Sequence, residues 1–143
     1  MVNIITLDML IEKEACQKQV DLFKQYFGKS VEITEEICIK YSNEFHIEWL
    51  VNNMLNEEQC ELYHTIQVPA YAAYNAIQGP VLEKYLAIQE PAYEAYKAIH
   101  GLTWKEYKDI QWPAYKEYKA IEGPAYEAYN KEKARAFYIV YNS

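Results

Sequence analysis

The sequence has few of the residues that flexible or disulfide-bonded proteins require. It holds only four glycines and three cysteines in 143 residues, of which 51% are hydrophobic and 24% charged. So little glycine leaves few flexible linkers, and this balance of hydrophobic and charged residues is typical of one globular domain rather than a disordered chain. Three cysteines without a framework spacing favour unpaired thiols in a reducing compartment.

Long hydrophobic runs and an excess of positive charge are also missing. No stretch approaches the roughly 20 apolar residues that span a bilayer, and the first residues do not form a basic and then apolar signal sequence. The net charge of −7 argues against a general affinity for DNA or anionic membranes. We therefore expect a cytoplasmic protein that does not associate with membranes.

The motifs that would name a reaction are absent as well. The sequence has no nucleophile elbow, phosphate-binding loop or zinc-protease helix, and no clustered carboxylates outside a solvated helix face. Cys60 and His64 have the spacing of two metal ligands on one helix, but no second pair completes a site. Cys60 also falls on a core position of the repeat described next. We expect no enzymatic activity, no metal site and no cofactor.

An eleven-residue repeat beginning Pro-Ala-Tyr occupies the second half of the chain. Proline is taken as position one of the repeat and occurs at Pro69, Pro80, Pro91, Pro113 and Pro124. Leu102 occupies the one position of this series that lacks a proline. Position six is always tyrosine: Tyr63, Tyr74, Tyr85, Tyr96, Tyr107, Tyr118 and Tyr129. Position nine is isoleucine, failing only at Glu132: Ile66, Ile77, Ile88, Ile99, Ile110 and Ile121. Such a period indicates helical structure, because eleven residues make three turns.

The period places positions two, three, six and nine on one stripe centred on the tyrosine. A proline inside a helix costs about 3 kcal/mol, whereas as the first helical residue it costs little. Gly79, Gly101 and Gly123 precede units and are typical of helix ends. We therefore predict an all-α fold in which helices of about nine or ten residues stack as a solenoid. One alternative is a helix pair of about 22 residues as the unit, and another is one long helix bent at each proline.

The predicted domain organisation has three parts. Residues 1–57 form a helical head, residues 58–134 the repeats, and residues 135–143 a C-terminal cap that folds back over the last repeat or forms a strand. In the head we expect helices at Leu7 to Ala15, Cys16 to Phe27, Thr34 to Tyr41 and His46 to Leu55, with an extended link from Lys29 to Ile33. Thr6, Thr34 and Asn56 are the expected N-caps, and Gly28 closes the second helix.

The residue pattern of the head resembles that of a known protein family. The pattern Ala15-Cys16-x-x-Gln19-Val20-x-x-Phe23-x-x-x-Phe27-Gly28, followed by Thr34, Cys38, Phe45 and Trp49, resembles a family of small phage and prophage proteins of unknown function. Members are similar in carrying eleven-residue Pro-Ala-aromatic-x-x-Tyr repeats after such a head, and the likeness spans nearly the whole chain. It implies a viral or mobile-element origin, but it brings no activity and no catalytic residues. This sequence is richer in tyrosine than that family, and it has lysine where the family pattern leads us to expect arginine.

Position three and a series of lysines supply the candidate binding residues. The apolar or aromatic side chains at position three lie at the edge of the stripe and are candidates to line a groove: Tyr71, Tyr93, Trp104, Tyr115 and Tyr126. The lysines at positions seven and four form a candidate basic stripe: Lys97, Lys108, Lys119, Lys105 and Lys116. The plainer interpretation of these lysines is helix-surface ion pairing, Glu94 with Lys97 and Lys105 with Asp109.

Three functions follow as hypotheses. We expect a non-catalytic, phage-encoded protein that presents a repetitive aromatic face to a host protein in the host cytoplasm, with inhibition of a host defence or regulatory factor as its role. The first alternative is a binder of nucleotides or single-stranded nucleic acid, which would use the tyrosines and the lysine stripe. The second alternative is a homo-oligomer, because repeats that stack within a chain can also stack between chains.

Overall fold

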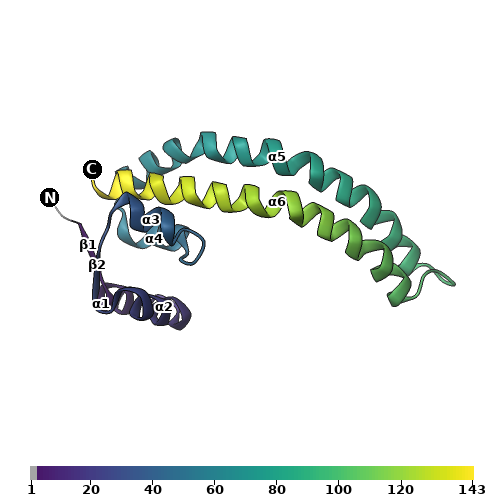
Figure 1. The fold of residues 1–143 in the computed structure, drawn as a ribbon, viewed down its shortest axis with the longest axis horizontal. Coiled ribbons are helices and arrows are strands. Elements are labelled where there is room, and N and C mark those ends of the chain that lie inside the picture. The colour runs from purple at the N-terminus through teal and green to yellow at the C-terminus, as the bar shows by residue number, and fades with distance from the viewer. Residues whose placement is uncertain (1–2) are drawn as a thin grey trace. The chain divides into compact units, whose positions relative to one another are not determined.

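The computed structural model describes residues 3–143 and confirms the all-α class (Figure 1). Two short strands, β1 (Ile4–Thr6) and β2 (Ser30–Glu32), pair antiparallel, with Ile5 opposite Val31. The helices are α1 (Leu7–Glu12), α2 (Gln17–Phe27), α3 (Glu35–Lys40), α4 (Ile47–Met54), α5 (Glu57–Lys97) and α6 (Trp104–Tyr141). The chain divides into two compact units, one made of the residues up to Ala70 together with Tyr129–Ser143, and the other of Tyr71–Ala128.

Local capping signals set the helix boundaries of the first unit as predicted. The hydroxyls of Thr6 and Thr34 each accept a hydrogen bond at 3.2 Å from a backbone amide in the first turn of α1 and α3. Asn56 and Gln59 bond each other's backbone amides at 2.8 and 3.0 Å, which makes a capping box at the start of α5. Gly28, at φ 71°, ends α2. Only α1 is clearly shorter than predicted, since it ends at Glu12.

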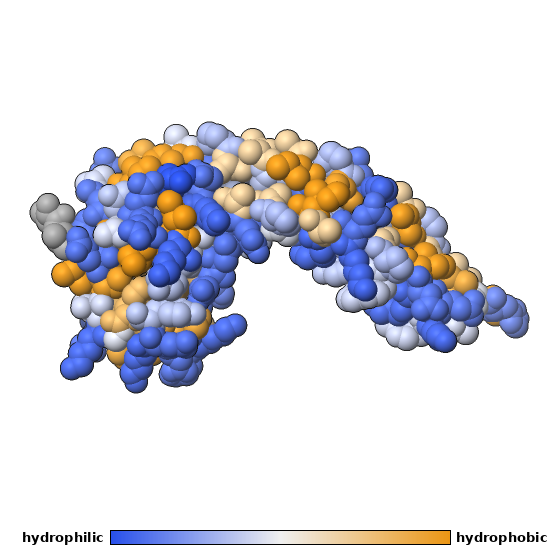
Figure 2. Space-filling model, in the orientation of Figure 1, coloured by the Kyte–Doolittle hydropathy of each residue, from blue (hydrophilic) through white to orange (hydrophobic). Residues whose placement is uncertain are grey.

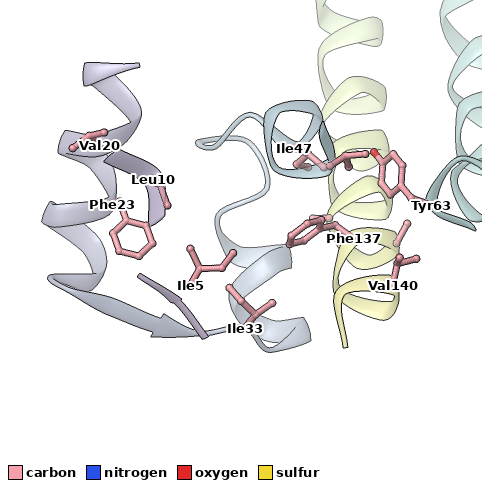
Figure 3. Close-up of a cluster of buried hydrophobic side chains, with 12 residues drawn as sticks. Ile5, Leu10, Val20, Phe23, Ile33, Ile47, Tyr63, Phe137 and Val140 are labelled. Atoms are coloured by element: carbon pink, nitrogen blue, oxygen red, sulfur yellow. The ribbon is translucent and has the colours of Figure 1, made fainter. Parts of the chain in front are cut away.

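The first unit has one hydrophobic core built from all its elements (Figure 3). Ile5 from β1, Phe23 from α2 and Ile47 from α4 are between 3% and 4% exposed. Phe137 and Val140 near the end of α6 are 2% and 0% exposed. The segment Arg135 to Ser143 therefore neither folds back nor forms a strand, and that prediction is wrong: its apolar residues continue α6 and complete the core of the head.

The repeats do not form separate short helices, so the predicted solenoid is wrong. Both Gly79 and Gly123, expected at helix ends, lie inside α5 and α6. The prolines are also interior to these two helices, and all five are exposed: Pro69, Pro80, Pro91, Pro113 and Pro124. Position one lies about 130° around the helix from position six. The carbonyl that each proline leaves without an amide partner is then on the outer side, where water can satisfy it, and this lowers the cost of the proline.

The repeats are interrupted only at the slot that lacks proline. The turn between α5 and α6 contains His100 at φ 63° and Gly101, whose added Cβ would lie 1.7 Å from the carbonyl oxygen of Ala95. The amide of Leu102 donates to that same oxygen at 3.1 Å. Thr103 then caps α6, because its hydroxyl accepts from the amide of Glu106 at 3.2 Å. One long proline-bent helix, the alternative prediction, is therefore also wrong: there are two.

The second unit is an antiparallel hairpin of α5 and α6 (Figure 1). Its buried alanines, Ala92, Ala114 and Ala125, all occupy position two and leave room for close approach of the helices. Position six supplies the tyrosines of the interface, among which Tyr107 is only 6% exposed. The buried stripe is thus centred on the tyrosine, as predicted.

Position ten, not position nine, completes this stripe. In each of four pairs in the second unit, a tyrosine hydroxyl at position six meets the glutamine or glutamate at position ten of the opposite helix. The pairs are Gln89 with Tyr107 at 2.9 Å, Gln111 with Tyr85 at 2.8 Å, Tyr74 with Glu122 at 2.9 Å and Tyr118 with Gln78 at 3.4 Å. Tyr129 and Gln67 repeat this pairing at 2.8 Å within the first unit. One helix register satisfies all of them.

The isoleucines at position nine are consequently outside the interface of the hairpin. Positions two and ten lie about 33° on either side of position six, whereas position nine lies about 65° away. The isoleucines are accordingly between 38% and 49% exposed at Ile77, Ile88, Ile110 and Ile121, and 89% exposed at Ile99 in the turn. The prediction that position nine of these units belongs to the core is wrong.

Candidate binding surface of the hairpin

The rings at position three pack against the tyrosines of the opposite helix, and this contact fixes where they lie. The ring centroids are 5.4 Å apart for Tyr96 and Trp104, and 5.7 Å apart for Tyr93 and Tyr107. Further along the hairpin, Tyr115 lies 5.8 Å from Tyr85. Each helix therefore contributes position-three rings to the same face, because the two antiparallel helices use the same repeat in the same register.

Most of these rings are also exposed. Of the predicted binding residues, Tyr93 is 39% exposed, Trp104 55%, Tyr126 45% and Tyr71 49%, whereas Tyr115 is half-buried. Trp112, which was not predicted, is 50% exposed and stacks on Tyr115 with a centroid distance of 5.9 Å. The structure thus places the aromatic residues where they both support the hairpin and present ring surface to solvent.

Three of the predicted lysines lie over these rings. The ammonium of Lys97 is 4.8 Å from the ring centroid of Tyr93, that of Lys108 is 5.2 Å from Trp104, and that of Lys116 is 5.2 Å from Trp112. Each lysine follows its ring by four residues, so one helical turn brings the pair together. A cation over an aromatic ring at this distance is stabilising by about 0.5–1 kcal/mol at exposed sites. The i, i+4 spacing to Lys116 is the sequence signal that would have identified Trp112.

We call this set of residues the aromatic–lysine face. It consists of the rings and the three lysines that lie over them: Tyr93, Trp104, Trp112, Tyr115, Lys97, Lys108 and Lys116. The only charged residues of this set are its three lysines, on a chain whose net charge is −7. Lys97 also pairs with Glu94 at 3.1 Å, as the plainer interpretation predicted, but both side chains remain largely exposed.

The other two predicted lysines differ from these three. The ammonium of Lys119 lies 5.9 Å from the ring centroid of Tyr118. Lys119 forms an ion pair with the buried carboxylate of Glu122 at 2.7 Å. Burial by itself raises the pKa of Glu122, but the hydrogen bonds from Lys119 and Tyr74 outweigh it and the net pKa is lowered. In the described part of the chain Lys105 makes no ion pair with Asp109, and its ammonium lies over none of the rings. Of the five predicted lysines, Lys97, Lys108 and Lys116 lie over exposed rings of the face, and Lys119 is held by Glu122.

The first unit contains a cavity. The cavity has a volume of about 70 Å³, and its walls include the rings of Phe23, Phe27 and Phe45. Burial, and to a smaller extent the charge of Glu35, raises the pKa of the Cys38 thiol on this wall to about 12. A thiol with that pKa is not a nucleophile near neutral pH. The walls of the cavity are mostly apolar.

Residues 3–143 contain neither a metal-binding cluster nor a membrane-spanning helix. In this range no group of three or more histidine, cysteine, aspartate or glutamate side chains is arranged to hold a metal ion. The Cys60 thiol donates to the backbone carbonyl of Val51 at 3.4 Å, as a packed core thiol does. None of the described helices combines the length and apolar character needed to cross a bilayer.

Comparison with known proteins adds no family assignment. The chain matches no protein-family model, no curated protein and no solved structure. The resemblance to phage proteins therefore stays a prediction, and the function must be argued from the surface of the hairpin.

Proposed function

We propose that this chain is a non-catalytic binding protein and that the aromatic–lysine face is its contact surface for another protein. The single observation that carries the proposal is the alignment of half-exposed rings with lysines over them on one face of the hairpin. Large aromatic side chains such as tryptophan and tyrosine often contribute most of the binding energy in protein interfaces. A phage origin and a host partner remain part of the proposal, and they rest on the resemblance of the head.

The chemistry of the face favours a partner segment with acidic and apolar side chains. Carboxylates would reach the ammonium groups of Lys97 and Lys108, while apolar side chains cover the ring edges of Tyr93 and Trp104. Because these rings already pack on tyrosines of the opposite helix, they lose little freedom on binding, which favours affinity. Inhibition of a host factor is the role that fits a protein with such a contact surface.

Single-stranded nucleic acid is the second candidate, and the same contacts weigh against it. Bases stack on ring faces, but lysine ammonium groups lie over the rings of Tyr93, Trp104 and Trp112. Lys119, one of five lysines in the expected phosphate-tracking stripe, is bound to Glu122. A chain of net charge −7 also repels a polyanion.

The test compares two variants of the full chain in affinity capture from host lysate. The double variant Tyr93→Ser with Trp104→Ser removes two exposed rings, and the control Ala87→Ser with Ala120→Ser changes exposed alanines at position eight, which point away from both helices' interface. We expect a protein retained by the wild type and the control to be lost by the ring variant. For the purified pair, the dissociation constant should rise at least about tenfold.

Two results would contradict the proposal. One is a captured protein that binds the ring variant as tightly as the wild type, with helicity by circular dichroism unchanged. The other is tight, salt-sensitive binding of an oligothymidylate that disappears when Lys97 and Lys108 are replaced by glutamine, since that pattern indicates phosphate contacts.

A further inference from the structure

The face of the hairpin opposite the aromatic residues is apolar, and nothing within the second unit covers it. We call it the isoleucine face, formed by Ile77, Ile88, Ile110 and Ile121 at position nine of both helices. Hydrophobic surface is visible on both helices of the hairpin in Figure 2. A groove of about 80 Å³ opens on this face, with Val81, Tyr85 and Ile88 on one wall and Ala114, Tyr118 and Ile121 on the other.

Both walls of the groove come from the same repeat positions. Position two supplies Val81 and Ala114, and position nine supplies Ile88 and Ile121. The hairpin thus has an approximate internal two-fold symmetry, and its two helices present the same pattern on this face. Around each helix, position nine lies about 65° from position six, which faces the other helix of the hairpin. In a four-helix bundle, residues at such an angle face the second pair of helices.

The charges on the isoleucine face are balanced, unlike those on the aromatic–lysine face. Position five places Lys84 on α5 and Glu117 on α6, and their ion pair of 2.9 Å crosses the groove. Their side chains are 66% and 60% exposed, so both can reach a second partner. A two-fold axis parallel to the helices would bring Lys84 of one copy beside Glu117 of the other.

We propose that the isoleucine face is the contact between two copies of this chain, which pack their hairpins as an antiparallel four-helix bundle. The exposed isoleucines explain why position nine is apolar in units where it does not contribute to the hairpin interface. The contact is isologous, because the same residues of both copies meet. It leaves the aromatic–lysine face of each copy open, so the dimer is independent of the proposed binding function.

Sedimentation equilibrium of the full chain over a dilution series tests this proposal. We expect a dimer for the wild type, and a monomer for the double variant Ile88→Lys with Ile121→Lys, since four buried lysines would meet in each dimer. The matched control, Ala87→Lys with Ala120→Lys, adds the same charge to neighbouring exposed residues at position eight and should remain dimeric. Circular dichroism of both variants checks that the helices persist.

A charge exchange gives a second measurement that does not depend on burying lysine. Lys84→Glu should raise the dimer dissociation constant about tenfold or more, and adding Glu117→Lys should restore it, because opposite charges again face each other. A wild type that is monomeric throughout the series would overturn the proposal. So would a dimer that survives Ile88→Lys with Ile121→Lys, since the contact would then lie elsewhere.

Discussion

The hydroxyl of Tyr85 in α5 accepts a hydrogen bond of 2.8 Å from the side-chain amide of Gln111 in α6. The other end of that amide is also used, because Lys108 donates to its oxygen at 3.2 Å. Gln111 is only 8% exposed, so a missing partner could not easily be replaced by water. The long hairpin is therefore held by polar pairs inside an otherwise apolar stripe.

Tyr85→Phe should lower the free energy of unfolding by about 1–3 kcal/mol, because the buried amide of Gln111 loses its acceptor. Tyr63→Phe is the matched control. The Tyr63 hydroxyl is buried and has no hydrogen-bond partner in the described part of the chain, so its removal should be neutral or stabilising. Urea denaturation measures both. Equal losses for the two variants would show that the pairing with position ten does not stabilise the hairpin.

Acidification should weaken the hairpin through Glu122. Hydrogen bonds from Lys119 and Tyr74 outweigh burial and lower the pKa of this carboxyl in the folded state. A lowered folded pKa means that the stabilisation is present above the unfolded pKa of about 4.3 and is lost as the pH falls below it, through the folded pKa. Glu122→Gln should flatten this acid decline in thermal unfolding, whereas Glu127→Gln, at an exposed glutamate, should leave it unchanged.

Replacing the glycines that precede repeat units by alanine should stabilise the protein at two positions and destabilise it at the third. Gly79 and Gly123 lie inside helices, and a Cβ there would meet no atom within 4 Å. Gly79→Ala and Gly123→Ala should each raise the melting temperature, with a gain of about 0.5–1 kcal/mol. Gly101→Ala should destabilise instead, because its Cβ would overlap the Ala95 carbonyl at 1.7 Å. A gain at Gly101 would show that the turn lies elsewhere.

Burial separates two residues that the repeat pattern treats alike. Tyr107→Ala should cost about 3–5 kcal/mol, because this ring is 6% exposed between the helices. Ile99→Ala should change stability by less than about 0.5 kcal/mol, because Ile99 is 89% exposed. Chemical denaturation of the two variants, with the same slope expected for each, makes the comparison. A large loss at Ile99 would mean that an unseen contact covers the turn.

The sequence was sufficient for features that depend on neighbouring residues only. Thr6, Thr34, Asn56 and Gly28 act within one helical turn, and each marks a boundary where it was predicted. The prolines could not be interpreted in this way. Whether Pro80 begins a helix or lies within one depends on which side of the helix faces water, and that is decided by the packing of the other helix.

The binding surface could be predicted only in part, because its residues depend on the packing of two helices. Counting apolar positions found the tyrosines at position six and the rings at position three. It missed Gln89 and Gln111, because a glutamine enters a buried stripe only when a hydroxyl on another helix is there to meet it. The recurrence of glutamine at position ten was the available signal. Likewise, Thr103 as an N-cap, with Glu106 three residues later, marked the turn that Gly101 alone did not.

The pairing of position six with position ten has a consequence for how the chain can change in length. Removing one unit from α5 alone would leave a tyrosine in α6 without a counterpart, whereas removing one unit from each helix would restore every pair. To keep these pairs, the hairpin can be shortened or extended only by eleven residues in both helices at once. Proteins built on this pattern would have their turn residues at the midpoint of the repeat array. The length of their hairpin would depend on the number of repeat units.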